Sequence, residues 1–259
     1  MARAIWKGVI RFEDEEVPVK LYAAVEDRSV HFRLLNERTK NPVKQRMVHP
    51  ETGAEVPYDE VRRGYQTEDG RIVLLDEEEL AALEPEAARG IQITRFVPPE
   101  KINHQWYDRP YYLGPDGAEG AYTALARALE RQGREGVARW TMRKKEYRGA
   151  LRAEDGHLLL ITLRSADEVV AAAELPRPEG RKLDARELKM ARQLISALED
   201  AWEPAAWQDE YRERVMELVE AKASGKTVKF RKPKARREEK SLEEALKKSV
   251  AAARKGKAA

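Results

Sequence analysis

Basic side chains alternate along two predicted strands between Val30 and Val48, on either side of a turn-rich loop at Asn36–Pro42. Each arm of about six residues would span about 20 Å at about 3.3 Å per residue. A projecting ribbon with such a basic face could lie along a phosphate backbone, where isolated positive charges position a nucleic acid without reading its sequence. The same pattern also occurs in ordinary surface hairpins with a solvated polar face. The candidate phosphate contacts in or beside this ribbon are Arg28, His31, Arg33, Arg38, Lys40, Lys44 and Arg46.

Two shorter basic clusters could contact the same kind of ligand. Arg62 and Arg63 directly precede Gly64, and a second cluster follows a predicted strand that exposes Arg139. The members of this second cluster are Arg143, Lys144 and Lys145. Each cluster by itself is more typical of a solvated turn, so only their arrangement in space can show whether they act together.

The net charge of the chain changes sign near residue 223. Residues 223–259 contain 13 Lys or Arg and 4 Asp or Glu, a net charge of +9, whereas residues 1–222 carry −6. An acidic body with a basic tail favours a polyanionic partner, most often nucleic acid, although such ends also occur as merely solvated segments. The composition of Lys226–Lys240 is typical of disorder, and Ser241–Ala253 could form one short helix. The candidate contacts in the tail are Lys226, Lys229, Arg231, Lys232, Lys234, Arg236 and Arg237.

Most signatures of catalysis are missing from the sequence. The chain has no Cys, and its four His are too scattered for a closed zinc site, so we expect no metal and no cofactor. It lacks a Walker A loop, a Gly-x-Gly-x-x-Gly turn and a Gly-x-Ser-x-Gly elbow. A lysine could act as a Schiff-base nucleophile on abasic sites, but the sequence singles out none. We therefore expect a binding protein that is not an enzyme.

The elements that would position these residues change in type along the chain. Hydrophobic residues with a period of two, or in short continuous runs, predict strands up to Leu163. Outside the ribbon these strands are Ala4–Phe12, Val17–Tyr22, Ile72–Leu75, Ile91–Val97, Tyr111–Leu113, Val137–Met142 and Leu158–Leu163, with helices at Asp76–Leu83 and Ala121–Gln132. From residue 184 the period is 3.6, and Asp184 with Glu187 resembles a capping box. The pattern predicts an α+β chain, with a β-rich core followed by a helical arm.

The sequence also bears on location. No apolar run approaches the roughly 18 residues that a membrane span needs. The first residues, Met1–Gly8, lack the apolar stretch of a signal peptide. We expect a cytoplasmic protein that makes no membrane contact.

Seven short blocks occur in a defined order between residue 2 and about residue 225. They are Ala2–Gly8, Val17–Tyr22, Gly53–Tyr58 with Gly64–Tyr65, Phe96–Pro98, Tyr107–Leu113, Glu187–Ala191 and Trp207–Lys222. In this order they resemble the bacterial Ku proteins; any one block is weak, but seven in order are specific. One departure is that His49 and Thr52 stand where some relatives place Cys-x-x-Cys, so no metal role carries over.

The resemblance implies a homodimer that binds DNA ends in bacterial non-homologous end joining, which repairs double-strand breaks. Family members form a ring whose β-barrels cradle duplex DNA, while a projecting DNA-bridging β-ribbon passes over it. The parts expected here are a barrel core at 1–180 with a bridge region at about 27–65, a helical C-terminal arm at 181–225 and a basic tail at 226–259. A LigD-type ATP-dependent DNA ligase is the implied partner, which we expect to dock on residues 184–222, and the implied location is the nucleoid.

Two alternatives remain open from the residues themselves. The first is an enzyme acting on DNA ends, such as a lysine-dependent lyase at abasic sites. The second is a nucleoid architectural protein that binds DNA mainly through its basic tail.

Overall fold

The computed structural model describes residues 3–86, 88–177, 180 and 184–226. The chain divides into two units, one formed by Met1–Arg28 and Phe32–Glu174 and the other by Ser29–His31 and Leu175–Ala259. Within the described residues, no helix combines the length and the apolar character needed to cross a membrane.

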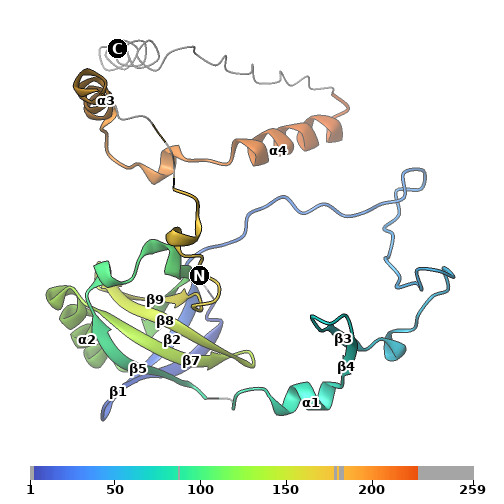
Figure 1. Cartoon of the computed structure of the whole chain (residues 1–259), viewed down its shortest axis with the longest axis horizontal. Helices are drawn as coiled ribbons and strands as arrows, with labels where there is room; N and C mark the ends of the chain where they lie inside the picture. Colours follow the sequence, from blue (N-terminus) through green and yellow to red (C-terminus); the bar gives the residue numbers. More distant parts are fainter. Residues whose placement is uncertain (1–2, 87, 178–179, 181–183, 227–259) are drawn as a thin grey trace. The chain divides into compact units, whose positions relative to one another are not determined.

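The first unit contains a closed barrel of seven strands (Figure 1). Neighbouring strands are antiparallel, except that β1 and β5 close the barrel through a short parallel contact. Closure pairs the two sheet edges that would otherwise be open to aggregation. The predicted β-rich core is therefore confirmed as a barrel. In barrel order the strands are β1 (Trp6–Phe12), β2 (Glu15–Ala23), β6 (Tyr107–Pro115), β9 (His157–Leu163), β8 (Lys145–Glu154), β7 (Glu135–Met142) and β5 (Gly90–Val97).

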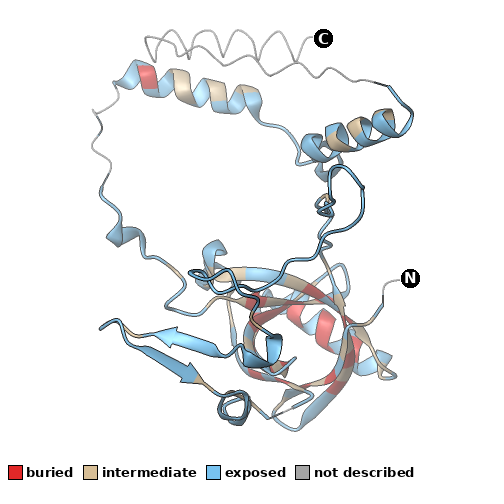
Figure 2. Cartoon of the chain, turned by 90° about the vertical axis from the view of Figure 1, so that its right-hand side faces the viewer, coloured by how far each residue is buried: buried red, intermediate tan, exposed pale blue. Residues whose placement is uncertain are grey.

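Period-two patterning places the hydrophobic core inside this barrel (Figure 2). In β2, the buried residues Val17, Val19 and Leu21 alternate with residues that stay partly exposed, as expected for a strand with one face on a core. Trp140 of β7 is fully buried and stacks on Tyr147 of β8, with 5.5 Å between ring centroids. Full burial of each Val, Leu or Ile side chain stabilises the fold by about 1.5–3 kcal/mol, so these inward rows fix the strand registers.

Helix α2 (Glu119–Gln132) packs on the barrel, with one face buried in the barrel core. Its Tyr122 hydroxyl donates a hydrogen bond to the carbonyl of Leu113 (2.6 Å) and accepts one from the N–H of Leu158 (2.9 Å). The helix ends at Gly133, whose φ of 56° lies in the left-handed region that a C-cap glycine adopts. The predicted helix and its C-cap are confirmed.

The strand registers define two ends of the barrel. The β1–β2 turn, the β8–β9 turn and α2 lie at one end, which we call the capped end. The start of β5 pairs with β1 and with the last part of β7, so the β7–β8 turn lies at the opposite end. The chain leaves β2 and enters β5 at this second end, which we call the connection end.

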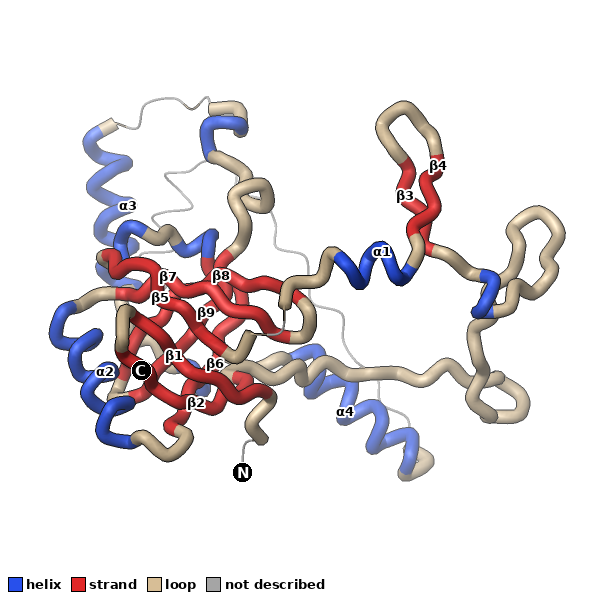
Figure 3. The backbone as a smooth tube through the Cα atoms, turned by 90° about the horizontal axis from the view of Figure 1, so that it is seen from below, coloured by secondary structure: helices blue, strands red, loops and turns tan. Residues whose placement is uncertain are grey.

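Residues 24–89 form a long connection between β2 and β5 that adds no strand to the barrel (Figure 3). None of the described residues of this connection is buried. It contains a separate two-stranded ribbon, because β3 pairs antiparallel with β4. Its elements are η1 (Tyr58–Glu60), β3 (Arg63–Gln66), β4 (Ile72–Leu75) and α1 (Glu77–Ala82).

The ribbon predicted at Val30–Val48 is wrong in its position. These residues form no continuous strand, and their pairing is limited to isolated bridges. Phe32 and Leu34, which the alternation would place on a buried face, are 68% and 62% exposed. Without a buried face, no packing energy fixes a strand ladder there. The turn at Asn36–Pro42 does form, because the Asn36 side chain accepts two backbone N–H groups at 3.0 Å.

The second unit contains α3 (Ala185–Leu198) and α4 (Glu210–Ala223). The predicted capping box is confirmed: the N–H of Glu187 donates to Asp184 (2.8 Å), and the N–H of Asp184 donates to Glu187 (3.1 Å). Between the two helices, the rings of Trp202 and Trp207 lie 5.1 Å apart. The remaining short 3-10 turns of the chain are η2 (Pro99–Lys101), η3 (His104–Trp106), η4 (Ala172–Glu174) and η5 (Pro204–Ala206).

Candidate nucleic-acid interface

A row of polar and basic residues crosses the outer face of the barrel. The strand registers pair Arg11 of β1 with Gln92 of β5, Gln92 with Arg139 of β7, and Arg139 with Arg148 of β8. Directly paired residues point to the same face of a sheet, and this face is the outer one because Trp140, next to Arg139, points into the core. We call these four residues, three arginines and one glutamine, the arginine row. Their side chains are all exposed.

The arginine row concentrates positive charge that the protein balances only in part. Arg139 and Arg148 are direct cross-strand partners, and like charges in that position are destabilising. Arg11 has an acidic partner, Glu16, at 2.8 Å, whereas Arg148 approaches Glu146 only to 4.0 Å. No carboxylate among the described residues lies within 4.0 Å of Arg139. A polyanion laid across the row would remove the repulsion.

The β7–β8 turn places three predicted basic residues beside this row, at the connection end. The turn has φ angles of 51° at Arg143 and 64° at Lys144. A two-residue type I′ hairpin turn needs positive φ at both central residues, and Asn and Gly adopt positive φ more readily than Arg and Lys do. Lys144 forms an ion pair with Glu84 of the long connection (2.9 Å), and Lys145 lies over the Tyr147 ring at 5.5 Å. The hairpin therefore carries Arg139 and the Arg143–Lys145 cluster together.

The other predicted contacts lie on the long connection and are not joined by a strand ladder. Arg28 pairs with Glu26 (3.2 Å), and Arg46 pairs with Glu55. The Arg62 guanidinium donates to the carbonyl of Asp59 (2.6 Å). The remaining residues of this group, all exposed, are His31, Arg33, Arg38, Lys40, Lys44 and Arg63.

The predicted contacts in the tail fall mostly beyond the part of the chain that the structure describes. Lys226 is exposed. The outlying ones are Lys229, Arg231, Lys232, Lys234, Arg236 and Arg237.

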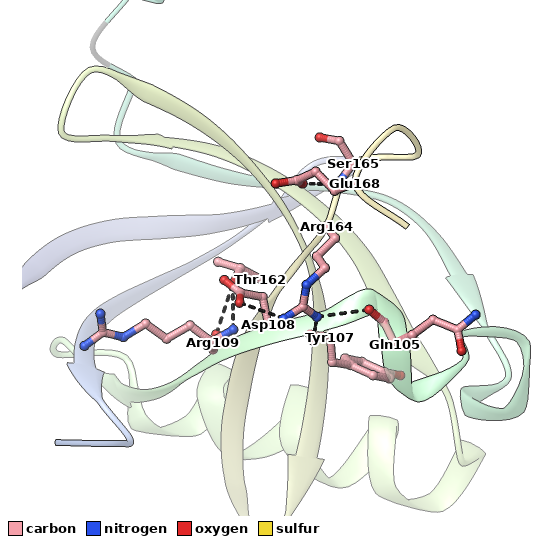
Figure 4. A network of polar contacts seen from close by, with 8 residues as sticks. All are labelled: Gln105, Tyr107, Asp108, Arg109, Thr162, Arg164, Ser165 and Glu168. Atoms are coloured by element: carbon pink, nitrogen blue, oxygen red, sulfur yellow. Dashed lines mark hydrogen bonds and ion pairs between the residues drawn. The ribbon is translucent and has the colours of Figure 1, made fainter. Parts of the chain in front are cut away.

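A polar network fixes the strands next to the arginine row (Figure 4). The Arg164 guanidinium donates to the carbonyls of Gln105 (3.0 Å) and Tyr107 and pairs with Asp108 (3.1 Å). The Thr162 hydroxyl of β9 accepts the N–H of Arg109 in β6 (2.9 Å). These bonds tie the start of β6 to the end of β9. They border a polar cavity of about 260 Å³ that is also lined by Lys145, Glu146 and Arg148.

One carboxylate is buried in the barrel wall. Glu135 is 1% exposed, accepts a hydrogen bond from the Tyr107 hydroxyl (2.6 Å) and pairs with Arg152 (2.5 Å). The Arg152 guanidinium also lies over the Tyr107 ring, 5.1 Å from its centroid. Burial, reinforced by the bond to Glu135, raises the pKa of Tyr107 to about 12. The triad links β6, β7 and β8, although Glu135 Oε1 and Arg152 Nε are buried without a hydrogen bond of good geometry.

Two features of the described residues bear on catalysis. Across the described residues, no group of three or more His, Asp or Glu side chains is placed to hold a metal ion. Lys20 hydrogen-bonds Asp116 (2.6 Å), and this bond raises the pKa of Lys20 above its usual value. A Schiff-base lysine needs the opposite shift, because the neutral amine is the nucleophile. Asp116 also pairs with Lys7 (3.2 Å), and its own pKa is lowered by the bonds to both lysines, to Lys20 first.

The sequence analysis named Arg139 as a candidate contact but did not name Arg11, Gln92 or Arg148, which the strand registers place beside it. Arg148 lies on β8, a strand that the hydrophobic pattern did not predict. Arg11 and Gln92 lie on predicted strands, and only the pairing of β1, β5 and β7, which are not consecutive in the chain, reveals that they are neighbours. The sequence did place Arg11 and Gln92 at outward positions of the period-two pattern, which is the signal that could have marked them as candidates.

Comparison with known proteins gives a consistent family. Residues 11–190 match the family model described as the Ku70/Ku80 beta-barrel domain. The chain is 38% identical over 258 residues to the non-homologous end joining protein Ku of Anaeromyxobacter sp. (strain K), covering 98% of this chain and 87% of the relative. It is 36% identical over 230 residues to non-homologous end joining protein Ku 2 of Geotalea uraniireducens (89% and 90%). For the Ku protein of Pseudomonas aeruginosa, identity is 38% over 228 residues (86% and 78%).

Proposed function

The chain belongs to the bacterial Ku family, and from this membership we propose that it binds the ends of double-stranded DNA, without sequence preference, in non-homologous end joining. The observation that carries the proposal is the arginine row on the outer face of the barrel. Its Arg139–Arg148 pair places like charges directly opposite each other, and an anion lying across the row would relieve that repulsion. Guanidinium groups on a rigid sheet can bind phosphates, and phosphate contacts position a duplex without reading its sequence.

We propose that the protein acts as a homodimer, because the ribbon in the long connection leaves apolar side chains uncovered in a single chain. An isolated two-stranded ribbon is marginally stable in water, yet the β3–β4 ribbon leaves Tyr65, Ile72 and Leu74 more than 60% exposed. The register puts Tyr65 and Val73 on one face and Ile72 on the other, so both faces need cover. A second copy related by a twofold axis would supply that cover with the same apolar surface.

Two barrels and two long connections would then enclose a duplex in a ring. A closed ring can be entered only at a free DNA end, so topology supplies selectivity for ends without any base contact. Phosphate neutralisation supplies affinity and permits sliding after loading. We propose that the helical arm (α3 and α4) recruits a LigD-type ATP-dependent DNA ligase, with Trp202 and Trp207, which are 69% and 72% exposed, as candidate contacts.

A competition binding experiment tests the proposal. Linear duplex and covalently closed circular duplex of the same sequence are offered to the full chain at one fixed salt concentration, since affinity depends on salt. We expect binding to the linear form and little or none to the closed circle. Equal affinity for the two forms would refute end selectivity and leave the tail-driven architectural alternative.

The lyase alternative has a separate test. An abasic-end duplex is incubated with the protein and borohydride, which traps an imine as a covalent adduct. The raised pKa of Lys20 argues against that lysine as the nucleophile, and we expect no adduct. A trapped adduct at stoichiometric yield would require an enzymatic role as well.

A further inference from the structure

The outer face of the β7–β8 hairpin carries charges in a defined order. The two strands run side by side (Figure 1), and every second cross-strand pair points outward. Arg139 and Arg148 form one outward pair, and the next outward pair towards the turn contains Glu146. The turn, which we call the tip of the hairpin, follows and exposes Arg143. From the arginine row to the tip, the order is therefore positive, negative, positive.

Local stability does not account for the residues at the tip. Arg143 and Lys144 have φ angles of 51° and 64°, in the left-handed region where Asn and Gly are favoured over long side chains. Lys144 is held by Glu84 at 2.9 Å, but no carboxylate among the residues that the structure describes lies within 4.0 Å of Arg143. Arg143 is thus an exposed cation at a strained backbone position, and such positions gather at functional sites.

The distance between the two positive positions matches one groove of B-form DNA. Arg143 follows Arg139 by four residues, which is about 13 Å along a strand at about 3.3 Å per residue. The major groove is about 12 Å wide and the minor groove about 6 Å. Because the arginine row runs across the strands, a phosphate backbone lying on the row leaves the hairpin pointing over the groove beside that backbone. At this spacing only the major groove brings the second backbone to the tip.

We propose that the β7–β8 hairpin spans the major groove and contacts both backbones of a duplex, with Arg139 and Arg148 on one backbone and Arg143 on the other. The proposal rests on the proposed function, DNA binding at the arginine row. Glu146 would then face the groove, where the amino groups of cytosine and adenine are hydrogen-bond donors. A backbone running lengthwise along the hairpin would instead meet this carboxylate, which repels phosphates.

This placement makes Arg143 a residue that determines specificity for duplex DNA. A single strand has only one backbone, so it cannot occupy the arginine row and the tip at the same time. Loss of the tip cation should therefore weaken binding to a duplex and leave binding to a single strand unchanged. Loss of a row arginine should weaken both.

Salt-dependent binding of the full chain to double-stranded and single-stranded DNA of equal length tests the proposal. The test variant is Arg143→Asn, because Asn suits a turn residue with positive φ, so thermal unfolding should occur at an unchanged or higher temperature. Arg139→Ala reports on the row. The matched control is Arg131→Asn, which removes the same charge from an exposed position on α2 at the capped end.

On the duplex, we expect Arg143→Asn to lower the slope of log K against log salt by about 0.9 per protomer, an affinity loss of about eightfold at 0.1 M relative to 1 M salt. On the single strand, this variant should bind as the unmodified chain does, whereas Arg139→Ala should bind more weakly to both DNAs. Arg131→Asn should change neither. Glu146→Lys makes the outer face positive throughout, so it should strengthen single-strand binding about fivefold, from a slope change of about 0.7.

Equal losses for Arg143→Asn on the duplex and the single strand would overturn the proposal, as would the absence of a loss on the duplex. An unfolding temperature lowered by Arg143→Asn would contradict the assignment of the tip as a strained turn. The preference of the unmodified chain for linear over closed circular duplex is measured separately. Its absence would count against end binding, whereas equal losses on the two DNAs count only against the placement of the hairpin.

Discussion

The arginine row makes a prediction in which DNA affinity and stability move in opposite directions. The perturbation is the double substitution Arg139→Ala/Arg148→Ala, which removes the like-charged cross-strand pair. Both side chains are exposed, so their loss removes little packing. Relief of the repulsion should leave stability unchanged or raise it by a few tenths of a kcal/mol.

The loss of DNA affinity follows from counterion release. If each guanidinium neutralises one phosphate, the slope of log K against log salt falls by about 0.9 for every arginine removed. The double substitution then lowers the slope by about 1.8 for one protomer and about 3.6 for a homodimer. At 0.1 M salt, relative to 1 M, a change of 3.6 corresponds to an affinity loss on the order of 10³-fold.

The assay is fluorescence anisotropy on a short linear duplex at several salt concentrations, with thermal unfolding of the same samples. The matched control is Arg127→Ala/Arg131→Ala, which removes the same charge from exposed positions on α2 at the capped end. We expect its slope to equal that of the unmodified chain. A wild-type slope for the row variant would refute the row as a phosphate site, and equal losses in both variants would reduce it to an effect of net charge.

Three further predictions concern the tail, the buried triad and a barrel glycine. Removing residues 227–259 should weaken duplex binding and flatten its salt dependence while preserving the preference for ends in a gel-shift comparison; loss of that preference would make the tail the selective element. The pKa of Tyr107 is raised to about 12 from an unfolded value of 10.0, so its stabilisation is complete below pH 10 and is lost as pH rises towards 12. In denaturant unfolding, the free energy of unfolding should therefore decline at alkaline pH, and Tyr107→Phe should diminish this decline. The same substitution should lower the free energy of unfolding at neutral pH by about 1–3 kcal/mol, because Glu135 loses its hydrogen-bond donor. An identical alkaline decline in both proteins contradicts the assignment. A Cβ on Gly149 would lie 2.6 Å from the carbonyl oxygen of Ile161 and 2.7 Å from the Trp140 ring, so Gly149→Ala should cost about 1–3 kcal/mol in thermal unfolding, whereas Gly120→Ala, with open space around it, should not.

The barrel was predictable from the sequence where a strand has one buried face. Val17, Val19 and Leu21 alternate cleanly, and the strand forms where the alternation places it. In β8 only Gly149, Ala150 and Leu151 are buried, as a short continuous run between charged ends. The segment therefore shows neither the period of two nor the period of 3.6, and the sequence pattern does not predict a strand there. Its existence follows from pairing with β7 and β9 on both sides, which is information carried by other parts of the chain.

The arrangement of the candidate interface was less predictable for a related reason. Basic clusters next to one another in sequence, such as Arg143–Lys145, can be found by inspection. The arginine row cannot, because it depends on which strands are neighbours and on their registers. The alternation of Phe32 and Leu34 was misleading because a pattern specifies a strand only if a partner buries one face. None of the described residues of the first unit buries these two side chains.

Topological trapping tests the central claim, that the protein encircles DNA loaded from an end, most directly. The protein is loaded on a linear duplex, the ends are then joined enzymatically into a closed circle, and the complex is challenged with about 1 M salt. Phosphate contacts are lost under those conditions, so an encircling dimer should stay on the circle and leave only when the circle is cut. Dissociation from the uncut circle as fast as from linear DNA would contradict the ring and, with it, the topological account of end selectivity.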